Sequence, residues 1–152
     1  MAHEHIVSII LVEDDDGHAT LVEKNLRRAG VTNQFLRLRD GQEALEYFFS
    51  EPPPDAVSLH NAVVLLDVNM PRVDGIEVLR RLKNSPATAS LPVIMLTTTD
   101  DPREIERCYE LGCNVYITKP VEYDAFIEAV RRLGFFLQVV KLPPNAGSAV
   151  RL

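Results

Sequence analysis

Charged and hydroxyl side chains stand at the ends of four apolar segments of this chain. Glu13 and Asp14 follow the first such segment, and Asp67, Thr97 and Lys119 each follow a later one. If the segments are parallel strands of an open sheet, ligand sites form outside their carboxyl ends, and these residues share one crevice. That crevice would collect three carboxylates, one hydroxyl group and one ammonium group.

Carboxylates this close together repel one another unless a cation joins them. Oxygen ligands suit Mg2+, which keeps several waters and needs only one or two carboxylates plus phosphate oxygens. Asp67 could then attack a phosphoryl donor as a nucleophile, with Lys119 facing the incoming oxygens and Thr97 donating a hydrogen bond. Acidic residues at strand ends also cap helices, which we expect for Asp15 and Asp16, and Lys119 could simply neutralise a carboxylate.

The elements that would position these residues alternate between strand and helix five times, which is typical of a doubly wound parallel sheet. Apolar segments predict strands over residues 6–12, 34–39, 62–66, 93–96 and 115–118. The first is almost wholly apolar, as expected of a strand buried on both faces, whereas the second alternates in part, as at a sheet edge. The pattern therefore predicts an α/β fold.

Helix boundaries are marked by capping signals. Asp40 and Glu43 form a capping-box-like pair, Asp101 precedes a first-turn proline, and Gly30 and Gly112 stand where helices should end. The last helix is predicted from apolar residues at helical spacing, which are Tyr123, Phe126, Ile127, Val130, Leu133 and Leu137.

Composition restricts the class of protein. The chain has 152 residues, which suits one domain, and a net charge of -6, which argues against a general nucleic-acid binder. It shows neither an apolar run near the roughly 20 residues of a membrane helix nor a secretion signal, so we expect a cytoplasmic protein. Cys108 and Cys113 fit neither a redox pair nor a zinc site and are expected to be free thiols.

Four motifs resemble those of the response-regulator receiver family. They are ILVEDD at 10–15, LLDVNMPRVDG at 65–75, IMLTTT at 94–99 and YITKP at 116–120. The resemblance implies one receiver domain over residues 1–137, folded as a flavodoxin-like (βα)5 sandwich with a five-stranded parallel sheet of order 2-1-3-4-5. Residues 138–152 would form an extension that is apolar at first and then disordered.

The resemblance also implies a role for each site residue. Asp67 is the expected phosphoacceptor of a histidine kinase, Thr97 the switch hydroxyl, and Lys119 the contact to the acyl phosphate. Tyr116 would be an aromatic switch that follows the Thr97 hydroxyl inward, although it could also be an ordinary half-buried strand tyrosine. A Mg2+ ion would be held by the side chains of Glu13, Asp14 and Asp67 and by the backbone carbonyl of Asn69.

Some residues near the motifs depart from the family pattern or have weaker expectations. Thr98 stands where a smaller residue is usual, which is expected to narrow access to the phosphoryl group. Asn69 and Thr99 would flank the path of the hydrolytic water and tune dephosphorylation. The histidines, among them His18 in the first turn of the first helix, are expected to be solvent-exposed scaffolding.

Three other functions were weighed against a signalling role without enzymatic activity. A Mg2+-dependent phosphatase of the haloacid-dehalogenase type needs a second Asp two residues after the nucleophile, and this chain has Asn69 there. A flavodoxin-like nucleotide-binding domain needs a phosphate-cradling loop, whereas the acidic 13–16 segment would repel phosphate. A transcription factor needs a helix-turn-helix or a basic face, and the sequence shows neither.

Partners follow from the tail and from a narrower resemblance. The apolar segment 135–142 would expose an unusual hydrophobic patch in a monomer, so we expect a homodimer through the last helix and the tail, with folding of the tail onto its own domain as the alternative. Three features are similar to single-domain regulators that partner phytochrome-type histidine kinases: the long loop after the second predicted helix, the segment EDDDGHATLVEKNLRRAG at 13–30 and the tail ending in LPP.

Overall fold

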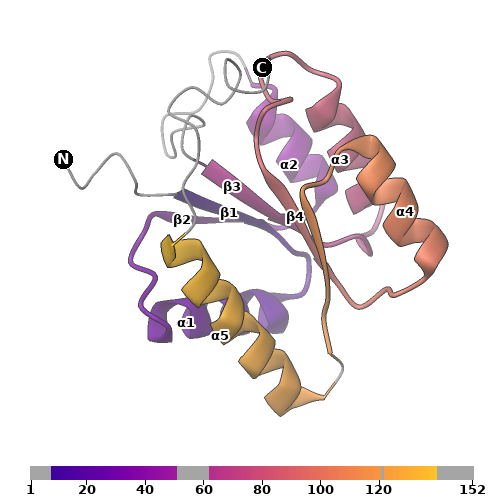
Figure 1. Cartoon of the computed structure of the whole chain (residues 1–152). Helices are drawn as coiled ribbons and strands as arrows, with labels where there is room; N and C mark the ends of the chain where they lie inside the picture. The colour runs from indigo at the N-terminus through magenta and orange to yellow at the C-terminus, as the bar shows by residue number, and fades with distance from the viewer. Residues whose placement is uncertain (1–7, 51–61, 121, 140–152) are drawn as a thin grey trace.

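Five parallel strands form the sheet at the centre of the protein (Figure 1). The computed structural model describes residues 8–50, 62–120 and 122–139. The sheet has the order β2-β1-β3-β4-β5, as expected, so β2 and β5 are its edges. Its strands are β1 (Ser8–Val12), β2 (Phe35–Leu38), β3 (Ala62–Leu66), β4 (Val93–Thr97) and β5 (Val115–Thr118).

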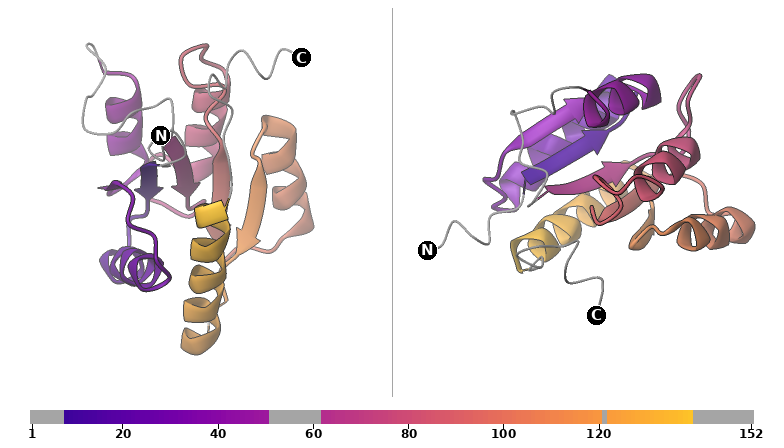
Figure 2. Two further views of the ribbon diagram at one scale, coloured as in Figure 1. Left: turned by 60° about the vertical axis from the view of Figure 1, so that its left-hand side comes forward. Right: turned by 90° about the horizontal axis from the view of Figure 1, so that it is seen from above.

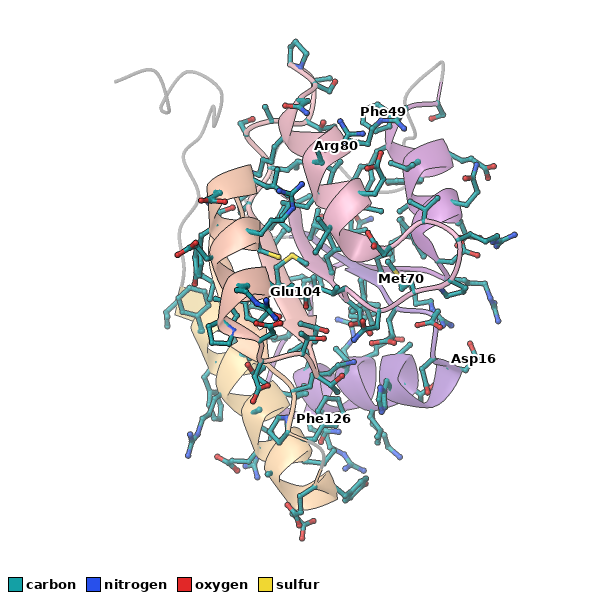
Figure 3. All side chains as sticks on the ribbon, turned by 90° about the vertical axis from the view of Figure 1, so that its right-hand side faces the viewer. Asp16, Phe49, Met70, Arg80, Glu104 and Phe126 are labelled. Atoms are coloured by element: carbon teal, nitrogen blue, oxygen red, sulfur yellow. The ribbon has the colours of Figure 1, made fainter. Side chains whose placement is uncertain are left out.

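Helices cover both faces of this sheet (Figures 1 and 2). They are α1 (Asp16–Arg28), α2 (Gly41–Phe48), α3 (Gly75–Lys83), α4 (Pro102–Leu111) and α5 (Tyr123–Val139). Helices α1 and α5 lie on one face, and α2, α3 and α4 lie on the other. Figure 3 shows Phe126 of α5 beside α1, on the side of the sheet opposite to Arg80 of α3. The predicted α/β architecture is confirmed.

The two faces have separate hydrophobic cores because successive side chains of a strand point to opposite sides. In β1, Ile10 and Val12 enter the core beneath α2, α3 and α4, whereas Ile9 and Leu11 enter the core beneath α1 and α5. All four are at most 2% exposed. This double burial explains why the central strands read as continuous apolar runs rather than as alternating ones.

Aspartates cap the helices that follow the strands. Asp15, Asp40, Asp74 and Asp101 each accept a hydrogen bond from a backbone N–H in the first turn of the next helix. At the other end of α4, Gly112 has φ +110°, a left-handed conformation that favours glycine. The caps expected at Asp15, Asp40 and Asp101 are therefore confirmed, and those helices begin directly beyond the strand ends.

The predicted strands agree with the structure apart from their ends. Residues 6 and 7, which open the first predicted strand, lie outside the described residues, and β4 extends to Thr97. Helix α5 continues past Leu137 to Val139, where Gln138 donates hydrogen bonds to the carbonyl oxygens of Ala29 (2.6 Å) and Gly134 (3.1 Å). Residues 140–152, the rest of the predicted extension, lie outside the described residues.

Gly75 brings the start of α3 against the end of β3. A β-carbon on Gly75 would overlap the carbonyl oxygen of Asp67 and would lie 2.8 Å from its carbonyl carbon. Because backbone atoms cannot move aside as a flexible side chain can, we expect Gly75→Ala to lower the free energy of unfolding by about 3 kcal/mol. Urea denaturation measures this change.

Gly17 is a matched control for this substitution. Its β-carbon would meet only the Asp15 carboxylate, at 3.2 Å, and it lies in the exposed first turn of α1. Gly17→Ala should change the free energy of unfolding by less than about 1 kcal/mol, since alanine favours helices. Equal stability of the two variants would show that the close approach at Gly75 is not constraining.

Candidate functional site

Four buried polar side chains meet beyond the carboxyl ends of the strands. Glu13 follows β1, Asp67 follows β3, Thr97 ends β4 and Lys119 follows β5. They are 2%, 7%, 0% and 3% exposed, respectively. Charged groups this buried are uncommon unless they are paired, so the cluster indicates a functional site rather than ordinary surface charges. The structure thus buries four of the five residues predicted from the strand ends, and the fifth, Asp14, lies exposed beside Glu13 and Asp67.

Lys119 is the central charge of the cluster. Its Nζ atom lies 2.8 Å from Oε1 of Glu13 and 3.4 Å from Oδ2 of Asp67, with all three side chains buried. Burial raises the pKa of the Glu13 carboxyl, and the nearby charge of Asp67 raises it further, whereas Lys119 opposes both effects. Stability linked to Glu13 is therefore present below its unfolded pKa and is lost as pH rises through its folded pKa. Ionisation of Glu13 therefore lowers the free energy of unfolding.

Three carboxylates are placed to share a cation. Glu13, Asp14 and Asp67 each offer an oxygen atom, and these oxygens lie within 4.8 Å of one another. Asp14 is exposed, so the cluster opens to solvent on that side. An all-oxygen donor set with one open side fits Mg2+, which keeps part of its water shell. A bound cation would also relieve the repulsion that raises the pKa of Glu13.

Asn69 contacts two other residues at the mouth of the site. Its backbone N–H donates to Oδ1 of Asp67 at 3.3 Å, and its side chain donates to Oγ1 of Thr99 at 3.0 Å. The contact with Thr99 joins the loop after β3 to the loop after β4. Asn69 therefore borders Asp67 and holds Thr99 in turn, whereas their effect on dephosphorylation and a metal bond to the Asn69 carbonyl remain predictions.

Arg37 on the edge strand β2 fixes the acidic loop. Its Nε and Nη2 atoms donate to the backbone carbonyl of Glu13 at 2.9 and 2.7 Å. Its Nη1 atom donates to Oδ1 of Asp16 at 2.8 Å, where Arg39 also lies within 3.4 Å. Sequence reasoning missed this role of Arg37. The expectation that Asp16 caps a helix is wrong, because its carboxylate pairs with Arg37 and Arg39 while Asp15 supplies the side-chain cap of α1.

Thr97 and Tyr116 lie on adjacent strands and are linked through the loop after β4. The Oγ1 atom of Thr97 accepts from the backbone N–H of Thr99 at 3.5 Å, and the Tyr116 hydroxyl donates to the Thr99 carbonyl at 2.6 Å. Burial raises the pKa of Tyr116, and the charge of Glu104 adds to this effect, so the hydroxyl stays a donor. Tyr116 is half-buried, and its backbone N–H donates to the Tyr109 hydroxyl at 3.0 Å.

The expectation of a solvent-exposed His18 is wrong. The residue is half-buried, with Nδ1 lying 3.3 Å from Nζ of Lys119 and its ring packed on Phe126. The first turn of α1 begins just beyond the acidic loop, so a side chain there can reach the end of β5. The cysteines are free and buried as expected, and burial raises the pKa of Cys108 to about 11.

Comparison with known proteins gives a consistent picture. Residues 9–131 match the family described as "Response regulator receiver domain". The response regulator Rcp1 of Synechocystis sp. is 32% identical over 136 residues, which cover 89% of this chain and 92% of Rcp1.

Within the described part of the chain, no helix has the length and apolar character that a membrane span requires.

Solved structures are similar over nearly the whole fold. A response regulator receiver domain from Rhodospirillum rubrum is 47% identical with a TM-score of 0.83, and the match covers 91% of this chain and 99% of that one. The Mn2+-bound form of Rcp1 has a TM-score of 0.80 at 32% identity, covering 90% and 99%. The phosphorylated cyanobacterial phytochrome response regulator RcpA has a TM-score of 0.76 at 29% identity, covering 88% and 95%.

Proposed function

We propose, from the premise that this chain belongs to the response regulator receiver domain family, that Asp67 accepts a phosphoryl group from a histidine kinase. The chain is a receiver domain of a two-component response regulator, and its relatives include phytochrome response regulators. The observation that carries the assignment of Asp67 is its buried carboxylate, 3.4 Å from Lys119 and within 4.8 Å of two further carboxylate ligands.

The proposed reaction is an in-line transfer between two nucleophiles. A carboxylate oxygen of Asp67 attacks the phosphorus of a phosphohistidine, the P–N bond breaks, and its electron pair returns to the imidazole of the kinase. Lys119 donates to an oxygen of the transferred group, where negative charge is concentrated. Thr97, fully buried beside it, donates its hydroxyl hydrogen to another oxygen once the acyl phosphate has formed.

Receiver domains bind a divalent cation at an acidic pocket, and the relative Rcp1 has a Mn2+-bound structure. In this chain the ligands would be Glu13, Asp14, Asp67 and the carbonyl oxygen of Asn69, with Mg2+ as the ion. When bound, the cation supplies positive charge to the phosphoryl oxygens. The residues of the chain hold the nucleophile and exclude bulk water on the buried side.

Labelling by a small phosphodonor tests the proposed function. Incubation of the protein with acetyl phosphate and Mg2+ should add one phosphoryl group to the intact mass, and no adduct should form when EDTA is present from the start. Asp14→Asn should raise the Mg2+ concentration needed for half-maximal labelling by about tenfold, since one ionised ligand is lost at an exposed position. Labelling that proceeds equally well in EDTA would contradict the metal site.

The alternative of a haloacid-dehalogenase-type phosphatase has no support from the family match or from the similar proteins. The side chain of Asn69, two residues after Asp67, is an amide that bonds to Thr99. An amide cannot act as the general acid and base which that reaction needs. We therefore assign the chain a signalling role and no turnover of an external substrate.

The phosphoryl signal would leave the site through the hydrogen bonds of the loop after β4. The Thr97 hydroxyl oxygen accepts from the backbone N–H of Thr99, whose carbonyl oxygen accepts from the Tyr116 hydroxyl. A shift of the Thr97 hydroxyl toward a phosphoryl oxygen would change this loop and the packing of Tyr116 against α4. Tyr116 is accordingly the residue that we expect to report the state of Asp67 to a partner.

The partner that phosphorylates Asp67 would be a histidine kinase of the phytochrome type, and this chain would meet it in the cytoplasm. Support comes from the names of similar proteins, which include RcpA and the bacteriophytochrome response regulator AtBRR, 38% identical with a TM-score of 0.62. The acidic net charge of -6 favours a protein partner over nucleic acid.

We further propose a homodimer through α5 and the tail beyond it. Phe135, Phe136 and Val139 are 54%, 46% and 73% exposed on this helix. Phe136 also lines an apolar groove of about 420 Å³ with Ile94, Val115, Ile117, Ala129, Arg132 and Leu133. Exposed aromatic side chains beside an apolar groove fit burial against a second copy.

Phe136→Ser should shift the protein from dimer to monomer in sedimentation, because it removes the aromatic side chain from the groove. Tyr123→Ser is the matched control, since Tyr123 is 61% exposed at the far end of the same helix. A wild-type protein that sediments as a monomer, or a Phe136→Ser protein that remains a dimer, would contradict this interface.

A further inference from the structure

His18 connects two helices to the phosphorylation site. It stands in the first turn of α1, and its Nδ1 atom lies 3.3 Å from Nζ of Lys119 at the end of β5. Its ring packs on Phe126 of α5, with 5.5 Å between the ring centroids and 42° between the ring planes. Phe126 is 5% exposed, so the imidazole rests on a fixed part of the core.

The chemistry of the two groups defines the contact. An ammonium group donates three hydrogens and accepts none, so a hydrogen bond across this 3.3 Å contact needs Nδ1 of His18 as its acceptor, in the tautomer that carries the ring proton on Nε2. The three partners of Nζ are Oε1 of Glu13, Oδ2 of Asp67 and Nδ1 of His18. The buried ammonium therefore has one partner for each hydrogen, and His18 is the neutral one.

We propose that His18 is a positioning residue that holds the Lys119 ammonium toward the phosphoryl group on Asp67, an inference that rests on the proposed function above. Mg2+ would bind oxygens of Glu13 and Asp67, and the phosphoryl group would be attached to Asp67. Both would therefore weaken the contacts that Lys119 makes with these two carboxylates. The contact with His18 involves neither the metal nor the reacting oxygens. It keeps the long, flexible lysine side chain in one direction throughout the reaction.

The test compares two replacements of His18 in the full chain, by the rate of labelling with acetyl phosphate at saturating Mg2+. His18→Leu keeps an apolar contact with Phe126 but removes the acceptor, and should slow labelling by about tenfold, the effect of one lost hydrogen bond to a charged group. His18→Asn places an amide oxygen near the position of Nδ1 and should restore the rate to within about threefold of wild type. Mg2+ affinity from calorimetry should be unchanged in both.

A double-mutant cycle asks whether His18 acts through Lys119. In a Lys119→Ala background, His18→Leu should have no further effect on labelling, because the partner of the hydrogen bond is already absent. Lys24→Ala, at an exposed position of the same helix, is the control and should label at the wild-type rate. Thermal unfolding of each variant establishes that it is folded.

Distinct results would overturn this role. A His18→Leu protein that labels as fast as wild type, or a folded His18→Asn protein as slow as His18→Leu, would exclude positioning by a hydrogen bond. Additive effects of His18→Leu and Lys119→Ala would show that His18 acts by another route. If the wild type itself takes up no phosphoryl group, the proposed function fails and this inference fails with it.

Discussion

Asp67→Asn is expected to abolish labelling by acetyl phosphate at any Mg2+ concentration. The amide of asparagine has no ionised oxygen to attack phosphorus, and the other buried carboxylate of the cluster, Glu13, pairs with Lys119 at 2.8 Å. Intact-mass spectrometry of the variant should show the unmodified protein alone. The loss should be complete rather than partial, because the substitution removes the nucleophile and one metal ligand together.

Asp100→Asn is the matched control for this loss. Asp100 is exposed in the loop that follows β4, so the same change of carboxylate to amide is made near the site but outside it. The control should be labelled at the wild-type rate. Labelling of Asp67→Asn at a rate comparable to that of Asp100→Asn would show that the phosphoacceptor is another residue.

Lys119→Ala should slow labelling by about a hundredfold while leaving Mg2+ binding intact or tighter. Loss of one hydrogen-bond donor to the reacting oxygens has an effect of this size in enzymes. Metal binding should not suffer, because Lys119 now occupies an oxygen of Glu13 at 2.8 Å and competes with a cation for it. Mass spectrometry of samples quenched at successive times gives the rate of labelling, and calorimetry gives the Mg2+ affinity.

Slower labelling together with Mg2+ binding that is not weakened distinguishes a direct contact of Lys119 with the phosphoryl group from a structural role. If the lysine only neutralised Glu13 and Asp67, its removal would leave labelling near the wild-type rate once Mg2+ was saturating. Such a result would contradict the proposed contact between Lys119 and the phosphoryl group. Lys24→Ala, which removes an exposed lysine from α1, controls for the change in net charge.

Much of this protein could be predicted from its sequence because its elements are locally marked. Continuous apolar runs identified the buried strands, and β3 and β5 begin and end at the predicted residues. Aspartates at strand ends marked the helix starts. At Asp40 the carboxylate accepts a hydrogen bond from the backbone N–H of Glu43 at 2.8 Å, as the capping pattern implies. The rule that parallel strands place their ends at one edge then assembled Asp67 and Lys119 into a site.

The remaining site residues depend on contacts that no local pattern contains. His18 is one histidine in the first turn of a helix. Its partner Lys119 stands 101 residues later in the sequence, just beyond the end of β5. Arg37 looked like a polar residue of an edge strand, yet its guanidinium donates to the backbone carbonyl of Glu13, just beyond the end of the neighbouring strand β1. Both roles follow from how β1, β2, β5 and α1 pack together, which composition and periodicity do not reveal.

Chemical trapping of the phosphorylated residue tests the central claim most directly. Borohydride reduces an acyl phosphate to an alcohol, so treatment of the labelled protein should convert the phosphorylated aspartate to homoserine. Peptide mapping by mass spectrometry is expected to find homoserine at position 67, and only in protein labelled in the presence of Mg2+. Homoserine at another aspartate, or a stable phosphoryl group on a histidine or hydroxyl side chain, would contradict the assignment of Asp67 as the phosphoacceptor.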